Sequence, residues 1–183
     1  VLIGNGFDMA HGLKTSYMDF INWYWDKRIE AFVGNTSKVS EDCLCKLTIK
    51  DDSNISCWNV FAFGNSYFKD IQGNRTCSGY DVIKDFQNNP DEFSVTYSRF
   101  FETIHQSIET KGWVDIEADY YALLKECLKK NSTIEVKKLH EHFAYLQEKL
   151  IEYLLEIQAK STNKDIVLSS IKEKIYEPIS KYD

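Results

Sequence analysis

Glycines cluster at the start of the chain, in a pattern that can bind phosphate. Of the eight glycines among 183 residues, Gly4, Gly6 and Gly12 lie within the first twelve positions. Because glycine has no Cβ, it allows a tight backbone turn or the close approach of a ligand. Where such a turn joins a strand to a helix, the free N–H groups at the helix N-terminus attract an anion. The spacing therefore fits a nucleotide-binding turn.

The same spacing also fits a tight turn that binds nothing. The full G-x-G-x-x-G pattern is absent, since Met9 stands where its third glycine would be. Asp8 leaves two interpretations open, because a carboxylate at a helix N-terminus is stabilised by the helix dipole and repels pyrophosphate. Either Asp8 caps a rigid, empty turn, or it faces a ribose hydroxyl or a divalent ion while the N–H groups of Gly6 and Phe7 bind the phosphates. Asn5 beside them favours the second interpretation, since it is an odd choice for packing alone.

The elements on either side of the turn follow from apolar spacing. We expect residues 1–3 to end a buried strand and residues 7–11 to form a short helical turn that stops at Gly12. A longer helix follows, with Ser16 and Asp19 at the spacing of a capping box. Residues that recur every three or four positions predict its apolar face, namely Tyr17, Phe20, Ile21, Tyr24, Trp25, Ile29 and Phe32.

The middle of the chain has weaker patterns. We interpret CLCKLTI, residues 43–49, and GYDVIKDF, residues 79–86, as strands. Residues 91–112 are predicted to form one helix that stops at Gly112, and residues 113–131 another. The inward positions are expected to be Phe100, Phe101, Ile104 and Ile108 in the first helix, and Ile116, Tyr120, Leu123, Leu124 and Cys127 in the second.

The last third of the chain has the most regular pattern. Its apolar residues step by three and four over about three heptads, which is typical of a long helix in a bundle or coiled-coil hairpin. They are Val136, Leu139, Phe143, Leu146, Leu150, Tyr153 and Ile157. A final helix is expected over residues 165–177, because Pro178 cannot continue it. The long helix is also a candidate surface for a protein partner or a second copy of the chain.

Composition narrows the class of protein. Hydrophobic residues make up 43% and aromatic residues 14%, which is typical of a folded globular domain. The net charge of −6 disfavours a protein that grips a nucleic-acid backbone, because such binding needs clustered Lys and Arg. The sequence has no apolar run long enough for a membrane span and no visible signal peptide. Five scattered cysteines without C-x2-C pairs disfavour a zinc site and favour a reducing, cytoplasmic compartment.

Two other groups of side chains could in principle bind a metal. His140 and His142 lie two positions apart in the long helix, so their rings point about 200° apart and cannot share an ion. Asp115 and Asp119 share a helix face, but Glu117 points elsewhere, which favours a solvated acidic face. We therefore predict no metal site.

The opening segment resembles a known bacterial family. IGNGFDMAHGLKTSYMDF is similar to the start of the AbiH family of bacteriophage abortive-infection proteins, and WVDIE at residues 113–117 resembles a second motif of that family. The positions that fit the first motif are Gly4, Asn5, Gly6, Phe7, Asp8, Ala10, Gly12, Leu13, Thr15, Tyr17 and Phe20. The resemblance implies a role in defence against phage.

A more distant similarity implies a ligand. Sirtuin-like NAD-binding domains open with G-A-G-x-S-x-x-x-G-I-P, which places its glycines on Gly4, Gly6 and Gly12 without gaps. This chain departs from that pattern at Asn5, Asp8 and Lys14. The resemblance implies a cofactor site for NAD or a related nucleotide, formed by Gly4, Asn5, Gly6, Phe7, Asp8, Gly12 and Tyr17. The catalytic residues of such a site cannot be assigned on this chain.

Together these patterns predict an α/β fold. We expect one domain, with a Rossmann-like parallel sheet begun in residues 1–94 and a large helical region over residues 95–180. The chain starts inside an apolar run without a methionine, so we expect a segment of a longer protein whose sheet is incomplete here. We expect an abortive-infection protein that binds a nucleotide at the glycine turn and hydrolyses NAD. The alternative is a non-catalytic phage sensor or protein-interaction module in which the glycine turn is only structural.

Overall fold

A computed structural model describes residues 14–33, 38–50, 77–111, 115–129, 132 and 134–161. These contain the helices α2 (Tyr17–Val33), α4 (Gly79–Asn88), α5 (Arg99–Lys111), α6 (Ile116–Cys127) and α7 (Val136–Ser161), and the strands β1 (Val39–Glu41), β2 (Cys45–Ile49) and β3 (Phe93–Tyr97). The described part is therefore a mixed α/β structure. The strand expected at residues 1–3, the glycine turn and the helix expected at residues 165–177 lie outside the described residues.

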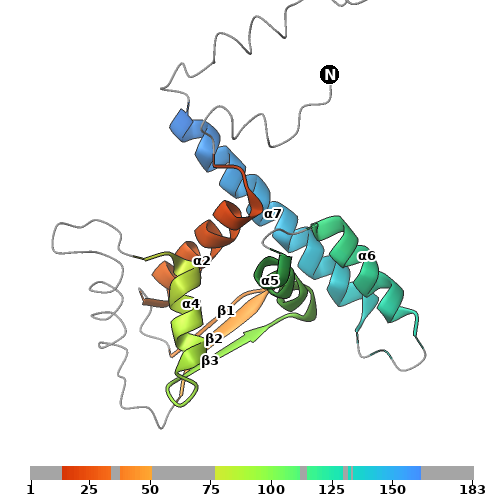
Figure 1. The fold of residues 1–183 in the computed structure, drawn as a ribbon, viewed down its shortest axis with the longest axis horizontal. Helices are drawn as coiled ribbons and strands as arrows, with labels where there is room; N and C mark the ends of the chain where they lie inside the picture. Colours follow the sequence, from red (N-terminus) through yellow and green to blue (C-terminus); the bar gives the residue numbers. More distant parts are fainter. Residues whose placement is uncertain are drawn as a thin grey trace, which may run out of the picture.

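The three described strands form one antiparallel sheet in the order β1-β2-β3. In β2, Cys45, Leu47 and Ile49 are buried while the residues between them are partly exposed, so one face of the sheet packs on the core. Figure 1 shows α2 and α4 side by side over the sheet, with α5 at the other end of the strands next to α6 and α7. All the described strand pairs are antiparallel, so the expected Rossmann-like parallel sheet is not shown in this part of the chain.

Residues 79–86 were predicted to be a strand, and this prediction is wrong. They lie in α4, whose buried residues recur at helical spacing at Gly79, Val82, Ile83 and Phe86. A capping box begins the helix, because the Ser78 side chain accepts from the Asp81 N–H and the Asp81 carboxylate accepts from the Ser78 N–H. The strand prediction for residues 43–49 is confirmed by β2.

The predicted helix over residues 91–112 also needs a correction. Its first part forms β3, where Val95 and Thr96 are β-branched and suit a strand, and where Phe93 is opposite Ile49. The helix begins only at Arg99, after Ser98, whose hydroxyl accepts from the Phe101 N–H at 3.3 Å. Its four predicted inward residues, Phe100, Phe101, Ile104 and Ile108, are all buried.

The most periodic helices are confirmed. In α2, six of the seven predicted face residues are buried, and only Tyr17 is exposed. The Ser16 hydroxyl accepts from the Asp19 N–H at 3.1 Å and donates to the Asp19 carboxylate at 2.6 Å, as the capping-box spacing predicted. In α7, the predicted stripe supplies the buried Leu139, Leu146 and Tyr153.

A histidine lies at the centre of an aromatic cluster in the core. The His105 ring stacks between Tyr80 and Tyr97, with ring centroids 5.4 and 4.8 Å away, and its Nε2 accepts from the indole N–H of Trp25 at 3.1 Å. Accepting that hydrogen bond requires a neutral ring. Burial, and secondarily the positive charge of Lys84, lower the pKa of His105 to about 4.

This histidine should make stability depend on pH. Its pKa is lower in the folded protein than the ordinary value of 6.5, so the unfolded chain binds a proton first as the pH falls. The contribution of neutral His105 is complete above pH 6.5 and is lost progressively toward pH 4. Between pH 7 and pH 5 we expect the free energy of unfolding to fall by about 2 kcal/mol from this group. Urea unfolding at both pH values would measure it.

The matched control is His105→Gln, whose side chain does not titrate. This variant should lose stability at pH 7, because the Trp25 N–H loses its preferred acceptor, but it should lose about 2 kcal/mol less than the wild type on acidification. An equal acid sensitivity in the two proteins would show that His105 is not held neutral.

Candidate functional site

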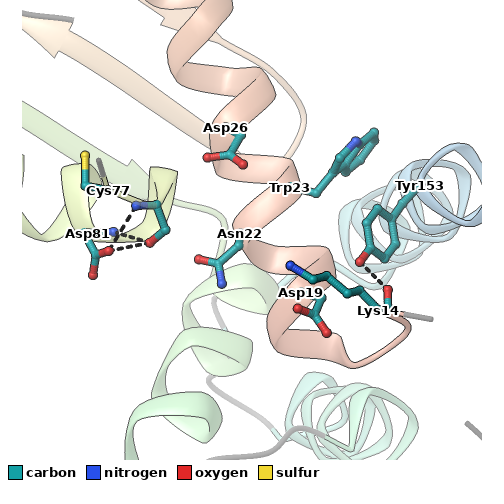
Figure 2. A pocket seen from close by; sticks show the side chains of 9 residues that line it. Lys14, Asp19, Asn22, Trp23, Asp26, Cys77, Asp81 and Tyr153 are labelled. Carbon is teal, nitrogen blue, oxygen red and sulfur yellow. Dashed lines mark hydrogen bonds between the residues drawn. The ribbon is translucent and has the colours of Figure 1, made fainter. Parts of the chain in front are cut away.

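A polar cleft opens beside the segment that follows the glycine turn in sequence (Figure 2). Its volume is about 540 Å³. Its walls come from the residues before α2, from one face of α2, from the start of α4 and from α7. The lining residues are Lys14, Asp19, Asn22, Trp23, Asp26, Cys77, Ser78, Asp81 and Tyr153.

The α2 wall is the polar side of the helix whose apolar side forms the core. Asp19, Asn22, Trp23 and Asp26 recur at spacings of three and four, so they share a face and point into the same space. The carboxylate of Asp19 is held by the hydroxyl of Ser16. Asn22 lines the cleft, and in the described part of the chain its Oδ1 is buried and has no hydrogen-bond partner.

The opposite wall is the start of α4, which approaches α2 very closely. The Gly79 N–H donates to Oδ1 of Asp26 at 2.7 Å. Because a carboxylate next to the N-terminus of a helix meets unpaired N–H groups, this bond is both a capping and a packing contact. Hydrogen bonds from Ser78 lower the pKa of Asp81, so this carboxylate is charged at neutral pH.

The third wall joins α7 to the entrance of the cleft. The Tyr153 hydroxyl donates to the backbone carbonyl of Lys14, and the Tyr153 ring packs on Trp23 with centroids 5.4 Å apart. The Trp23 indole N–H donates to Glu156 at 3.1 Å, and Glu156 pairs with Lys27 at 3.0 Å. Two residues after Gly12, the backbone is thus fixed at the edge of the cleft (Figure 2).

The charges of the cleft favour a ligand with hydrogen-bond donors. Three carboxylates, Asp19, Asp26 and Asp81, face it, and Lys14 is the cation among its lining residues. Such a surface repels a phosphate group on its own, whereas carboxylate and amide oxygens accept from hydroxyl groups, as those of a ribose. The described cleft can therefore hold the sugar part of a ligand but does not by itself supply a phosphate cradle.

Most of the predicted site lies beyond the described residues. Gly4, Asn5, Gly6, Phe7, Asp8 and Gly12 are in the undescribed segment, and their predicted role stays a prediction. Tyr17 is described as the first residue of α2, and it is 36% exposed. Burial, and then the charges of Glu117 and Asp115, raise its pKa. The negative charges of the WVDIE segment therefore act on the beginning of α2, about 100 residues away in sequence.

A hydrogen-bond network that the sequence pattern did not predict surrounds Asp42, in the turn between β1 and β2. Oδ1 of Asp42 accepts from the N–H groups of Leu44 and Cys45 at 2.8 and 2.9 Å. Its carboxylate also accepts from the hydroxyls of Tyr24 and Tyr145, at 2.9 and 3.2 Å to Oδ2. The turn is thereby tied to both α2 and α7.

The same network contains an ion pair and a thiol. Nε of Arg28 lies 3.4 Å from Oδ2 of Asp42 without the geometry of a hydrogen bond, and the two side chains are only 14% and 8% exposed. Burial raises the pKa of Cys45 to about 12. Because the Tyr24 hydroxyl donates its hydrogen to Asp42, the Cys45 S–H is the donor to the Tyr24 oxygen at 3.2 Å. Every oxygen of Asp42 is occupied, which makes the network a structural link rather than a reactive site.

The acidic residues at the start of α6, Asp115, Glu117 and Asp119, were expected to form a solvated face, but two of them make structural hydrogen bonds. Asp115 caps α6 by accepting from the Ala118 N–H, and Asp119 accepts from the Ser107 hydroxyl of α5 at 2.7 Å. Glu117 is exposed. Among the described residues, no three His, Cys, Asp or Glu side chains are grouped so as to hold a metal ion.

Comparison with known proteins assigns the family. This chain matches the family model "Bacteriophage abortive infection AbiH" over residues 1–183, and it therefore belongs to this family. No curated protein and no solved structure matches the chain. The similarity to sirtuin-like domains is not confirmed by these comparisons. Within the described ranges, no helix has the length and apolar character needed to cross a membrane.

Proposed function

We propose that this protein takes part in abortive infection, in which an infected bacterial cell stops supporting phage growth. The observation that carries this proposal is the match of the AbiH family model to residues 1–183. A strain that expresses the protein should reduce phage plaque formation relative to a strain that carries the empty vector. Equal plaque counts over a panel of phages would contradict the role.

We propose further that the glycine turn and the cleft together bind a nucleotide. The N–H groups of Gly6 and Phe7 would bind phosphate, and the ribose would lie in the cleft, beside Asn22 and the carboxylates that line it. The contact between Tyr153 and the Lys14 carbonyl supports this arrangement, because it holds the end of the glycine segment at the cleft. The proposal includes a Rossmann-like parallel sheet, with residues 1–3 as the strand before the turn.

The proposed reaction is hydrolysis of NAD. Water would attack the anomeric carbon of the nicotinamide ribose, the bond to nicotinamide would break, and the products would be nicotinamide, ADP-ribose and a proton. Loss of NAD would stop metabolism in the infected cell, which fits an abortive-infection role. The chain's cleft would contribute binding and orientation of the ribose, and no residue is assigned as catalytic.

The test is to incubate the purified protein with NAD and to measure nicotinamide by mass spectrometry. We expect release by the wild type and loss of release in Gly6→Val, because a side chain at this position would fill the space for phosphate. Asn22→Ala should weaken nucleotide binding about tenfold, since one buried hydrogen bond contributes about 1.4 kcal/mol. Asn88→Ala, at an exposed position of α4, is the matched control and should not change binding.

Two outcomes would contradict the nucleotide proposal. One is the absence of nicotinamide release together with unchanged thermal stability in NAD, ADP-ribose and ATP. The other is full activity of Gly6→Val. In either case the glycine turn would be structural. If no nicotinamide is released, the phage-defence role would rest on interactions with other proteins.

A further inference from the structure

The C-terminal half of α7 carries a second apolar stripe, separate from the one that packs on the core. Ile151, Leu154 and Leu155 are 59%, 39% and 59% exposed, and their spacing places them on one face of the helix. The buried stripe of α7 ends with Tyr153, on a different face. Figure 1 shows the last turns of α7 projecting beyond α2.

The composition of this stripe is not that of an ordinary solvated helix face. Continuing it toward the N-terminus of α7 at helical spacing adds the uncharged Gln147 and Ala144, while the exposed Glu148, three positions before Ile151, lies at its edge. Charged residues of α7, such as Lys149 and Glu152, lie on other faces. A stripe with three large exposed apolar side chains is typical of a face that another element covers.

The chain itself supplies a segment that fits. Residues 165–177, which lie outside the described part, have the sequence DIVLSSIKEKIYE, in which Leu168, Ile171 and Ile175 recur at helical spacing. Only residues 162–164 separate this segment from the end of α7, and a connection of two to five residues is typical of an antiparallel helix pair. Asn163 in that connection is suited to the left-handed conformation that often ends a helix.

Length and register agree with a return of the chain along α7. Thirteen helical residues are about 20 Å long, so a helix running back from Ser161 reaches about as far as Lys149 and passes the whole exposed stripe. If the chain reverses at Asn163, then Ile171 lies opposite Leu155 and Ile175 lies opposite Ile151. Ile151 and Leu155 are four residues apart in α7, and Ile171 and Ile175 are four residues apart in the returning segment. Both contacts can therefore form at the same time.

We propose that residues 165–177 form a helix that folds back on α7 and covers Ile151, Leu154 and Leu155, so that α7 and this segment form an antiparallel helical hairpin. The face then serves the protein's own fold rather than a partner. This inference is independent of the proposed nucleotide site.

Hydrogen–deuterium exchange on the full 183-residue chain tests the hairpin. We expect the amides of residues 165–177 to be protected in the wild type and to exchange at least about tenfold faster in Leu155→Glu, because a charge in the interface disfavours packing. The matched control is Leu128→Glu, at a leucine that is 82% exposed just after α6, which should leave this protection unchanged. Unchanged protection of residues 136–150 would show that α7 stays folded in each variant.

A double-mutant cycle addresses the pairing directly. Leu155→Ala and Ile171→Ala should destabilise less in combination than the sum of their separate effects, because each removes the same contact. Rapid exchange of residues 165–177 in the wild type would overturn the proposal. So would a dimeric mass in light scattering that becomes monomeric in Leu155→Glu, because the stripe would then be covered by a second copy. Strictly additive effects of the two substitutions would also overturn it.

Discussion

Replacing Asp42 with asparagine is expected to lower the free energy of unfolding by about 3 kcal/mol, because it removes one partner of a nearly buried ion pair. Arg28 would keep its charge in a site where its side chain is only 14% exposed, with a neutral amide as its neighbour. The amide would also present a donor group toward the Tyr24 and Tyr145 hydroxyls, both of which donate to Asp42. Urea unfolding followed by tryptophan fluorescence would measure the change.

The control for this variant is Asp91→Asn, which makes the same chemical change at an exposed position in the turn before β3. It should change stability by less than about 0.5 kcal/mol. Combining Asp42→Asn with Arg28→Met should be less damaging than the sum of the two single changes, because the unpaired charge is removed. A loss below about 1 kcal/mol in Asp42→Asn would mean that the network does not hold the hairpin to the helices.

Replacing Gly79 with alanine is expected to destabilise the protein by about 3 kcal/mol, at the upper end of the effect of overpacking. The added Cβ would lie 2.4 Å from the backbone nitrogen of Asp26 and 2.6 Å from the carbonyl carbon of Trp25. These are backbone atoms in the middle of α2, so the two helices would have to separate. The hydrogen bond from Gly79 to Asp26 would weaken as well.

The sign of this effect is what makes it informative. In an unconstrained helix, replacing glycine with alanine stabilises by up to about 1 kcal/mol, because alanine loses less backbone entropy. Asn88→Ala, on the exposed side of α4, provides the reference for a change that meets no neighbour. Thermal unfolding of the two variants would separate the cases, and a stabilised Gly79→Ala would show that α2 and α4 are not in close contact.

The helices α2, α6 and α7 could be predicted because their apolar residues repeat at one period over many turns. The start of α2 could also be predicted, since Ser16 and Asp19 are close in sequence and need no other element to form their contacts. The helix α4 was missed because its ten residues give a short pattern, although the capping spacing of Ser78 and Asp81 was available as a signal. The strand β3 was missed because apolar residues continue from it directly into α5.

The cleft and the Asp42 network could be predicted less well. Their residues come from elements as far apart as α2 and α7, and no local pattern brings Tyr24, Asp42 and Tyr145 together. The one available signal was Asp42 itself, because Asp in a turn often accepts from backbone N–H groups two or three residues later. The glycine turn, which was the strongest chemical pattern in the sequence, stays a prediction because it lies outside the described residues.

The burial of Cys45 also determines how the protein reacts with thiol reagents. Alkylating reagents attack the thiolate, and a pKa of about 12 leaves almost none of it on Cys45 at neutral pH. The side chain is also buried, whereas Cys43, Cys77 and Cys127 are partly exposed. Modification of Cys45 therefore requires the β1–β2 turn to separate from α2, and the rate of its labelling by iodoacetamide measures how often that opening occurs in the native protein.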